Sequence, residues 1–222
     1  MARLTPTNVL IGLNSLVFVL MVFSGVSPLA PQTREMVRWG ANFAPLSLGP
    51  QPWRVLTANY LHFGIVHLGL NMWCLWNLGS LAGRIFERWT YVLTYTLCGI
   101  AGSVVSLSVH PRGIGAGASG AIFGMAGALI AALALGKFSV PRAQLQPTIT
   151  SLVTFAGYNL LFGLIPGIDN AAHVGGFVCG LAMGAALAPR PEEGPEVRAR
   201  RRNLVGLGMA SLLSLTFFLL RR

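Results

Sequence analysis

The amino-acid sequence predicts an all-α polytopic membrane protein, and three observations support this fold class. Of the 222 residues, 54% are hydrophobic and only 10% are charged, whereas a soluble domain carries about 25% charged residues. The charged residues cluster, and the clusters leave seven long segments without any charge. Because an unpaired backbone is costly in lipid, such segments are expected to be helices that cross the bilayer.

The seven charge-free segments follow one another along the chain, and each is close to the roughly 20 residues that a spanning helix needs. They are residues 4–33, 55–83, 89–110, 113–136, 143–168, 170–189 and 203–220. The first segment could be mistaken for a signal peptide. Cleavage after Ala30 would leave Pro31 directly after the cut, which argues against processing, so we interpret the segment as a helix. The sequence therefore predicts seven spanning helices.

An eighth charge-free segment, residues 39–53, interrupts this series. It is rich in proline, and proline at that density does not form a spanning helix. We therefore predict a long outer loop over about residues 25–56, in which residues 33–42 form a short helix at the membrane surface.

A polar segment after the sixth span divides the chain into three parts. Residues 190–202 combine proline and glutamate with a run of arginines, and we predict that they form a basic linker on the cytoplasmic side. The predicted domains are a six-span core over residues 1–189, this linker, and a seventh transmembrane helix with the C-terminus over residues 203–222.

The lysines and arginines predict how the protein lies in the membrane. With the N-terminus inside, the segments between the spans place ten of these residues on the cytoplasmic side and six outside, in line with the bias that spanning proteins show. Loops that face the lipid bilayer explain the net charge of +10, so no nucleic-acid partner is predicted. We expect a bacterial inner membrane, a cytoplasmic N-terminus and a site that opens to the outer face.

Polar residues recur at the outer ends of the second, fourth and sixth predicted spans, which run in the same direction. They are His67 and Asn71, then Ser119, then His173. Histidine inside a membrane is rare and is by default a functional candidate. Small residues at every fourth position of the fourth and sixth spans favour close helix contact, which would bring Ser119 and His173 together.

A serine and a histidine at one depth are typical of nucleophilic acyl transfer. A serine hydroxyl needs an adjacent base, and a neutral histidine takes its proton and returns it to the leaving amine. The Asn71 amide, the His67 ring and the backbone N–H of Ser119 are candidate donors to the oxyanion. Asp169 precedes His173 by four residues, so a third member is an alternative to a Ser-His dyad. Each group alone also has a purely structural interpretation, in packing or in local hydrogen bonding.

Four motifs together resemble one family. They are WR at residues 53–54, HLGLN at 67–71, GASG at 117–120 and AHVGG at 172–176. In this order they are similar to the motifs of the rhomboid family of intramembrane serine proteases. The resemblance implies a rhomboid-like six-helix core, followed here by a seventh helix, and cleavage of a transmembrane protein substrate near the outer face.

The resemblance also implies residue roles. It implies a nucleophile and a base (Ser119 and His173), an oxyanion site (His67 and Asn71) and contacts to the substrate (Gly117 and Phe123). The chain departs from the family pattern at Gln51, where some members carry a carboxylate, and at Phe123, where some carry tyrosine. Phe123 can stack on His173 but cannot donate a hydrogen bond.

Neither a cofactor nor a metal is predicted, because the three cysteines are isolated in apolar segments. Two other functions fit a polytopic membrane protein. A catalytically silent rhomboid-like protein would bind membrane helices, or chaperone them, without cutting. A small transporter would show internal repeats and charged residues within the spans, and the sequence has neither.

Overall fold

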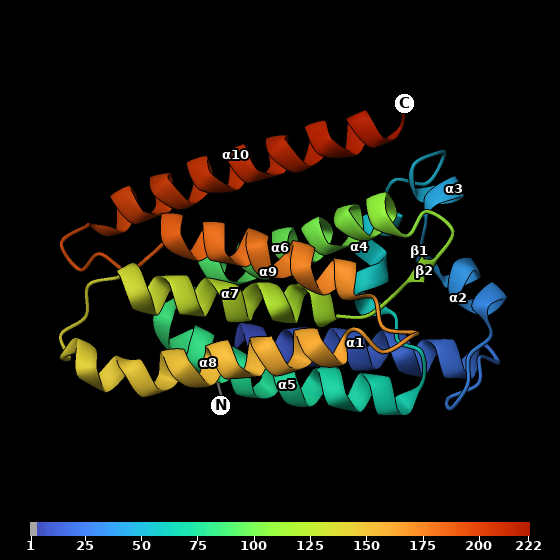
Figure 1. Ribbon diagram of the computed structural model, residues 1–222, viewed down its shortest axis with the longest axis horizontal. Coiled ribbons are helices and arrows are strands. Elements are labelled where there is room, and N and C mark those ends of the chain that lie inside the picture. The colour runs from blue at the N-terminus through green and yellow to red at the C-terminus, as the bar shows by residue number, and fades with distance from the viewer. Residues whose placement is uncertain (1–3) are drawn as a thin grey trace.

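The computed structural model describes residues 4–222, and helices dominate it. Residues 1–3, which belong to the predicted core and to the count of inner charges, lie outside the described part. Within that part, seven helices have 17 to 26 residues and run along the long axis of the molecule (Figure 1). They are α1 (Pro6–Phe23), α5 (Ile65–Ile85), α6 (Arg88–Val109), α7 (Ser119–Leu135), α8 (Arg142–Phe162), α9 (Asn170–Ala186) and α10 (Pro195–Leu220).

Short elements gather at one end of the bundle, which is called the loop end below (Figure 1). They are α2 (Thr33–Trp39), β1 (Asn42–Phe43), α3 (Ala44–Ser47), α4 (Arg54–Thr57), the 3-10 helix η1 (Ala58–Tyr60) and β2 (Ile114–Gly115). β1 pairs antiparallel with β2, with Asn42 opposite Gly115. The predicted fold class is therefore confirmed, because the protein is an integral membrane protein built almost wholly of helices.

Length and composition single out three helices in the described residues. α1, α6 and α10 are by themselves long and apolar enough to cross a membrane, and α7 is apolar but has 17 residues. α9 also has only 17 residues, and α8 contains Pro147. The number of spans therefore stays a prediction.

The contact between α7 and α9 forms the centre of the bundle. A methyl group on Gly176, Gly180 or Gly184 of α9 would collide with the backbone carbonyls of Gly120, Gly124 and Ala128 of α7. The two helices therefore touch backbone to backbone along the small-residue positions, as the sequence predicts. Figure 1 shows α9 lying along α7, with α6 next to both.

A buried arginine holds the segments of the predicted outer loop together. The side chain of Arg54 is 4% exposed. Its Nη1 donates to the carbonyl oxygens of Val37 and Ala41, at 2.7 and 2.9 Å. Its Nε donates to Oε1 of Gln51 at 2.7 Å. This one guanidinium joins α4 to the end of α2 and to the buried residue Ala41, through charge-assisted hydrogen bonds.

Two helices begin at other residues than the charge-free segments do. The second charge-free segment begins at residue 55, but α5 begins only at Ile65, after α4, η1 and a turn at Gly64 with φ +94°. The predicted linker 190–202 is helical from Pro195 onward, because proline suits the first position of a helix. Three of its arginines pair with carboxylates, and Arg198 Nε lies 2.6 Å from Glu87 Oε1.

Candidate active site

Ser119 is the first residue of α7, is half-buried and lines a cavity. Gly117 has φ +135°, a backbone conformation that favours glycine. A Cβ at Gly117 would lie 2.8 Å from Cε1 of His67, so a side chain there would displace that ring. The N–H groups of the first turn of a helix have no acceptor within the helix. Ser119 therefore combines an accessible hydroxyl with free backbone donors.

His173 lies in the first turn of α9 and faces Ser119. The distance between His173 Nε2 and Ser119 Oγ is 2.9 Å, which is hydrogen-bond distance. The close approach of the helices permits this contact, since a Cβ at Gly120 would lie 3.3 Å from the carbonyl oxygen of Ala172. The ring of Phe123 stacks on His173, with centroids 4.3 Å apart and planes 14° from parallel. The phenyl ring thus fixes the plane of the imidazole.

Asp169 does not orient the imidazole of His173. One carboxylate oxygen accepts from the backbone N–H of Ala172 at 3.1 Å. The other accepts from the hydroxyl of Ser106 on α6 at 2.5 Å. Within residues 4–222, Nδ1 of His173 is buried and has no hydrogen-bond partner. Asp169 therefore caps α9 and ties it to α6, and the geometry gives no third member of a triad.

We expect Asp169→Ala to destabilise the fold by about 1 kcal/mol, because an N-cap side chain that is lost typically costs this much. Asp169→Asn keeps an acceptor for the N–H of Ala172 and is expected to lose less. Thermal unfolding of the purified protein measures both. Equal midpoints for the two variants would contradict the role of Asp169 as a cap.

His67 and Asn71 lie one turn apart at the start of α5. The backbone N–H of Phe63 donates to Nδ1 of His67 at 3.3 Å, so in the neutral ring the proton is on Nε2. Nδ2 of Asn71 donates to the carbonyl oxygen of His67 at 2.9 Å and keeps a second N–H. The Nε2–H of His67 and the second N–H of Asn71 therefore stay available for another acceptor.

His62 lies behind His67, in the turn before α5. It is fully buried, and the two rings meet edge to face with centroids 5.1 Å apart. Burial, and then the neighbouring His67 ring, lower the pKa of His62 to about 3. His62 is therefore neutral at physiological pH and supports the His67 ring by packing.

One cavity joins the candidate residues. It has a volume of about 400 Å³ and lies between α5, α7, α8 and α9. Its walls include Ser119, His173, His67, Asn71, Phe123, Phe155, Asn159 and Ile168. Gly117 does not line it but holds the turn beneath His67. In the described residues no three histidine, cysteine, aspartate or glutamate side chains lie together as a metal site requires.

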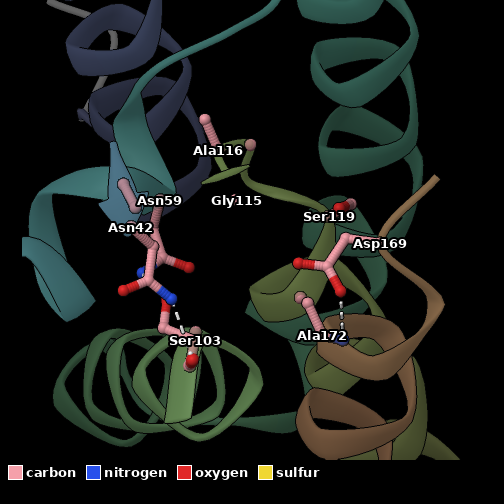
Figure 2. A pocket seen from close by; sticks show the side chains of 12 residues that line it. Asn42, Asn59, Ser103, Gly115, Ala116, Ser119, Asp169 and Ala172 are labelled. Carbon is pink, nitrogen blue, oxygen red and sulfur yellow. Dashed lines mark hydrogen bonds between the residues drawn. The ribbon is translucent and has the colours of Figure 1, made fainter. Parts of the chain in front are cut away.

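A second, smaller pocket lies behind Ser119 (Figure 2). It measures about 30 Å³, more than the roughly 10–15 Å³ that one water needs. Asn42, Asn59, Ser103 and Asp169 supply its polar walls. Figure 2 shows Asn42 bonded to the backbone of Ser103, at 2.9 Å, and Asp169 bonded to that of Ala172. The sequence does not predict this pocket, because the outer loop that carries Asn42 and Asn59 has no motif that places it against α6.

Comparison with known proteins identifies the family. The family model for the rhomboid domain matches residues 49–190, which is more than half of the chain. The chain belongs to the rhomboid family. The matched residues include the turn of Ser119, the start of α5 and the whole of α9.

Curated relatives agree with this assignment. The rhomboid protease GluP of Bacillus subtilis is 37% identical over 184 residues, which cover 82% of this chain and 35% of the relative. RHOMBOID-like protein 4 of Arabidopsis thaliana is 37% identical over 146 residues, covering 66% of this chain and 36% of the relative. Rhomboid-type serine protease 2 of Emericella nidulans is 32% identical over 146 residues, covering 64% and 28%. The chain thus matches about a third of the length of these relatives.

Proposed function

We propose that this rhomboid-family protein is an intramembrane serine endopeptidase that cleaves transmembrane segments with a Ser119–His173 dyad. The observation that carries the proposal is the 2.9 Å contact between Ser119 Oγ and His173 Nε2 at the wall of a cavity that is large enough for an extended peptide segment. Relatives that are named proteases support the reaction type.

The reaction begins with attack of Ser119 Oγ on the carbonyl carbon of the scissile peptide. Nε2 of His173 accepts the hydroxyl proton and returns it to the leaving amine, which gives an acyl enzyme and a free amine. Water then adds to the acyl carbon, with His173 again as base, and Ser119 leaves with the proton. The polar pocket behind Ser119 is a place from which one water can reach the ester.

The negative charge on the carbonyl oxygen develops near three donors. These are Nε2–H of His67, the second N–H of Asn71 and the backbone N–H of Ser119 at the positive end of α7. Gly117 and Phe123 act indirectly in this account: Gly117 leaves space for the His67 ring, and Phe123 holds the imidazole plane.

The site also suggests how the protein lies in the membrane. We place the loop end outside, the N-terminus in the cytoplasm and all seven long helices across a bacterial inner membrane, with α10 as an appended seventh span. The excess of lysine and arginine on the inner side supports this orientation. The partners are then a transmembrane protein substrate and the lipid bilayer.

A fluorophosphonate probe tests the nucleophile, since it reacts only with an activated serine. We expect covalent labelling of the folded protein at Ser119 and no labelling of Ser119→Ala. Ser108→Ala is the matched control, because Ser108 is exposed and donates only to the backbone of its own helix. A folded protein that the probe leaves unlabelled would favour a catalytically silent protein that binds membrane helices.

A further inference from the structure

A second cavity lies at the end of the bundle opposite Ser119, and the proposed protease function does not use it. It has a volume of about 210 Å³. The 17 residues of α9 separate it from the active site, a distance of about 25 Å at 1.5 Å per residue. Its walls are Ile85, Phe86, Glu87, Thr90, Leu187, Pro189, Arg190, Pro191, Arg198 and Arg201. It is called the arginine cavity below.

Positive charge is in excess in the arginine cavity. Three arginines line it, and only two carboxylates, those of Glu87 and Glu193, pair with them in the described residues. Arg198 joins Glu87 at 2.6 Å, and Arg201 joins Glu193 at 2.9 Å. Arg190 reaches Glu193 only at 3.3 Å, and half of its side chain is exposed. The carboxylates therefore leave a net positive charge that an anion can neutralise.

The arginines also have hydrogen-bond donors to spare. Nε of Arg201 is buried and finds no partner within residues 4–222. Arg198 uses Nε for Glu87 and Nη1 for the carbonyl oxygen of Glu193, so Nη2 has no acceptor among the described residues. A buried donor without a partner is costly, and guanidinium groups in such a state suit the oxygens of a phosphate.

The remaining walls of the arginine cavity are apolar, and its position fits a lipid. Aliphatic and aromatic side chains of the α5–α6 turn and of the segment after α9 face the arginines across it. It lies where α5 and α9 end and where α6 and α10 begin, which is the level of the headgroups for helices that cross a bilayer. A ligand with a phosphate beside an apolar part matches both kinds of wall.

We propose that the arginine cavity binds the phosphate of an anionic phospholipid headgroup. Arg190 and Arg198 contact the phosphate oxygens from the more exposed side, and Arg201 contacts them from within. The bound lipid also holds α10 against the core, since Arg198 and Arg201 belong to α10 while the opposite walls belong to α5, α6 and the segment after α9.

The test is a lipid titration of the 222-residue chain in mixed micelles, with thermal unfolding as readout. Dioleoylphosphatidylglycerol is expected to raise the midpoint at a concentration roughly tenfold or more below that of dioleoylphosphatidylcholine, because the three arginines favour the anionic lipid. The double variant Arg190→Gln/Arg198→Gln should lose this preference. Both side chains are partly exposed, so the variant is expected to fold.

Matched controls decide the source of the phosphate and the place of binding. Arg112→Gln removes an exposed arginine at the other end of α6 and should keep the full preference. The proposal is overturned if the double variant prefers phosphatidylglycerol as strongly as the parent, or if Arg112→Gln weakens the preference equally.

Inorganic phosphate is titrated in parallel. If it stabilises the parent as well as the lipid does, the ligand is a soluble phosphate and the assignment to a lipid is wrong.

Discussion

Replacement of His173 by alanine is expected to lower kcat by about 10⁴-fold or more, because Ser119 then has no base. The imidazole is the group that contacts Ser119 Oγ, at 2.9 Å. Binding of the substrate and the donors to the oxyanion remain, so KM should change little. The measurement is the initial rate of cleavage of a single-pass substrate by purified protein in detergent.

A matched histidine makes this result specific. His110 follows the last residue of α6, and its side chain is exposed. His110→Ala should cut at the rate of the parent. If His173→Ala retains more than a tenth of the parent rate at the same folded fraction, His173 is not the base and the proposed dyad fails.

Gly176→Ala is expected to reduce both stability and activity. The added methyl would meet the carbonyl of Gly120, the residue after Ser119, and backbone atoms cannot turn aside as a side chain can. Overpacking of this kind costs about 1–3 kcal/mol. Because α9 must move away from α7, the contact between Ser119 and His173 lengthens, and kcat should fall more than the lost stability explains.

Thermal unfolding and the cleavage rate of the folded fraction measure the two effects separately. Gly208→Ala in α10 is the control, since a Cβ there would meet nothing within 4 Å. That variant should be as stable as the parent or more stable by up to about 1 kcal/mol, because alanine favours a helix. A Gly176→Ala protein with the unfolding midpoint and rate of the parent would show that the close contact between α7 and α9 is not required.

The sequence predicts the centre of the molecule better than its loop end. Glycine and alanine at every fourth position of two apolar segments predict that the two helices pack closely in a membrane. Gly176 and Gly120 do meet in this way. That contact in turn places His173 beside Ser119, so the proximity of the two candidates follows from the periodicity. The fold class could be predicted because the long helices of the structure lie largely within the charge-free segments of the sequence.

The loop end and the helix boundaries depend on contacts that a linear pattern does not carry. Asn42 reaches the backbone of Ser103 across 61 positions, and Ser106 reaches Asp169 across 63. Charge-free segments mark where charges stop, not where helices begin, so α5 starts well after Arg54. The arginines of α10 also form ion pairs, such as Arg198 with Glu87, which only the folded chain brings together.

The proposed reaction requires that Ser119 cuts a peptide bond within the membrane. The most direct measurement is co-reconstitution of the protein with a single-pass substrate in lipid vesicles, followed by mass spectrometry of the fragments. We expect the parent to yield two fragments whose new ends come from one peptide bond within or beside the transmembrane segment, and Ser119→Ala to yield none. Cleavage by Ser119→Ala at the rate of the parent would contradict the proposed reaction.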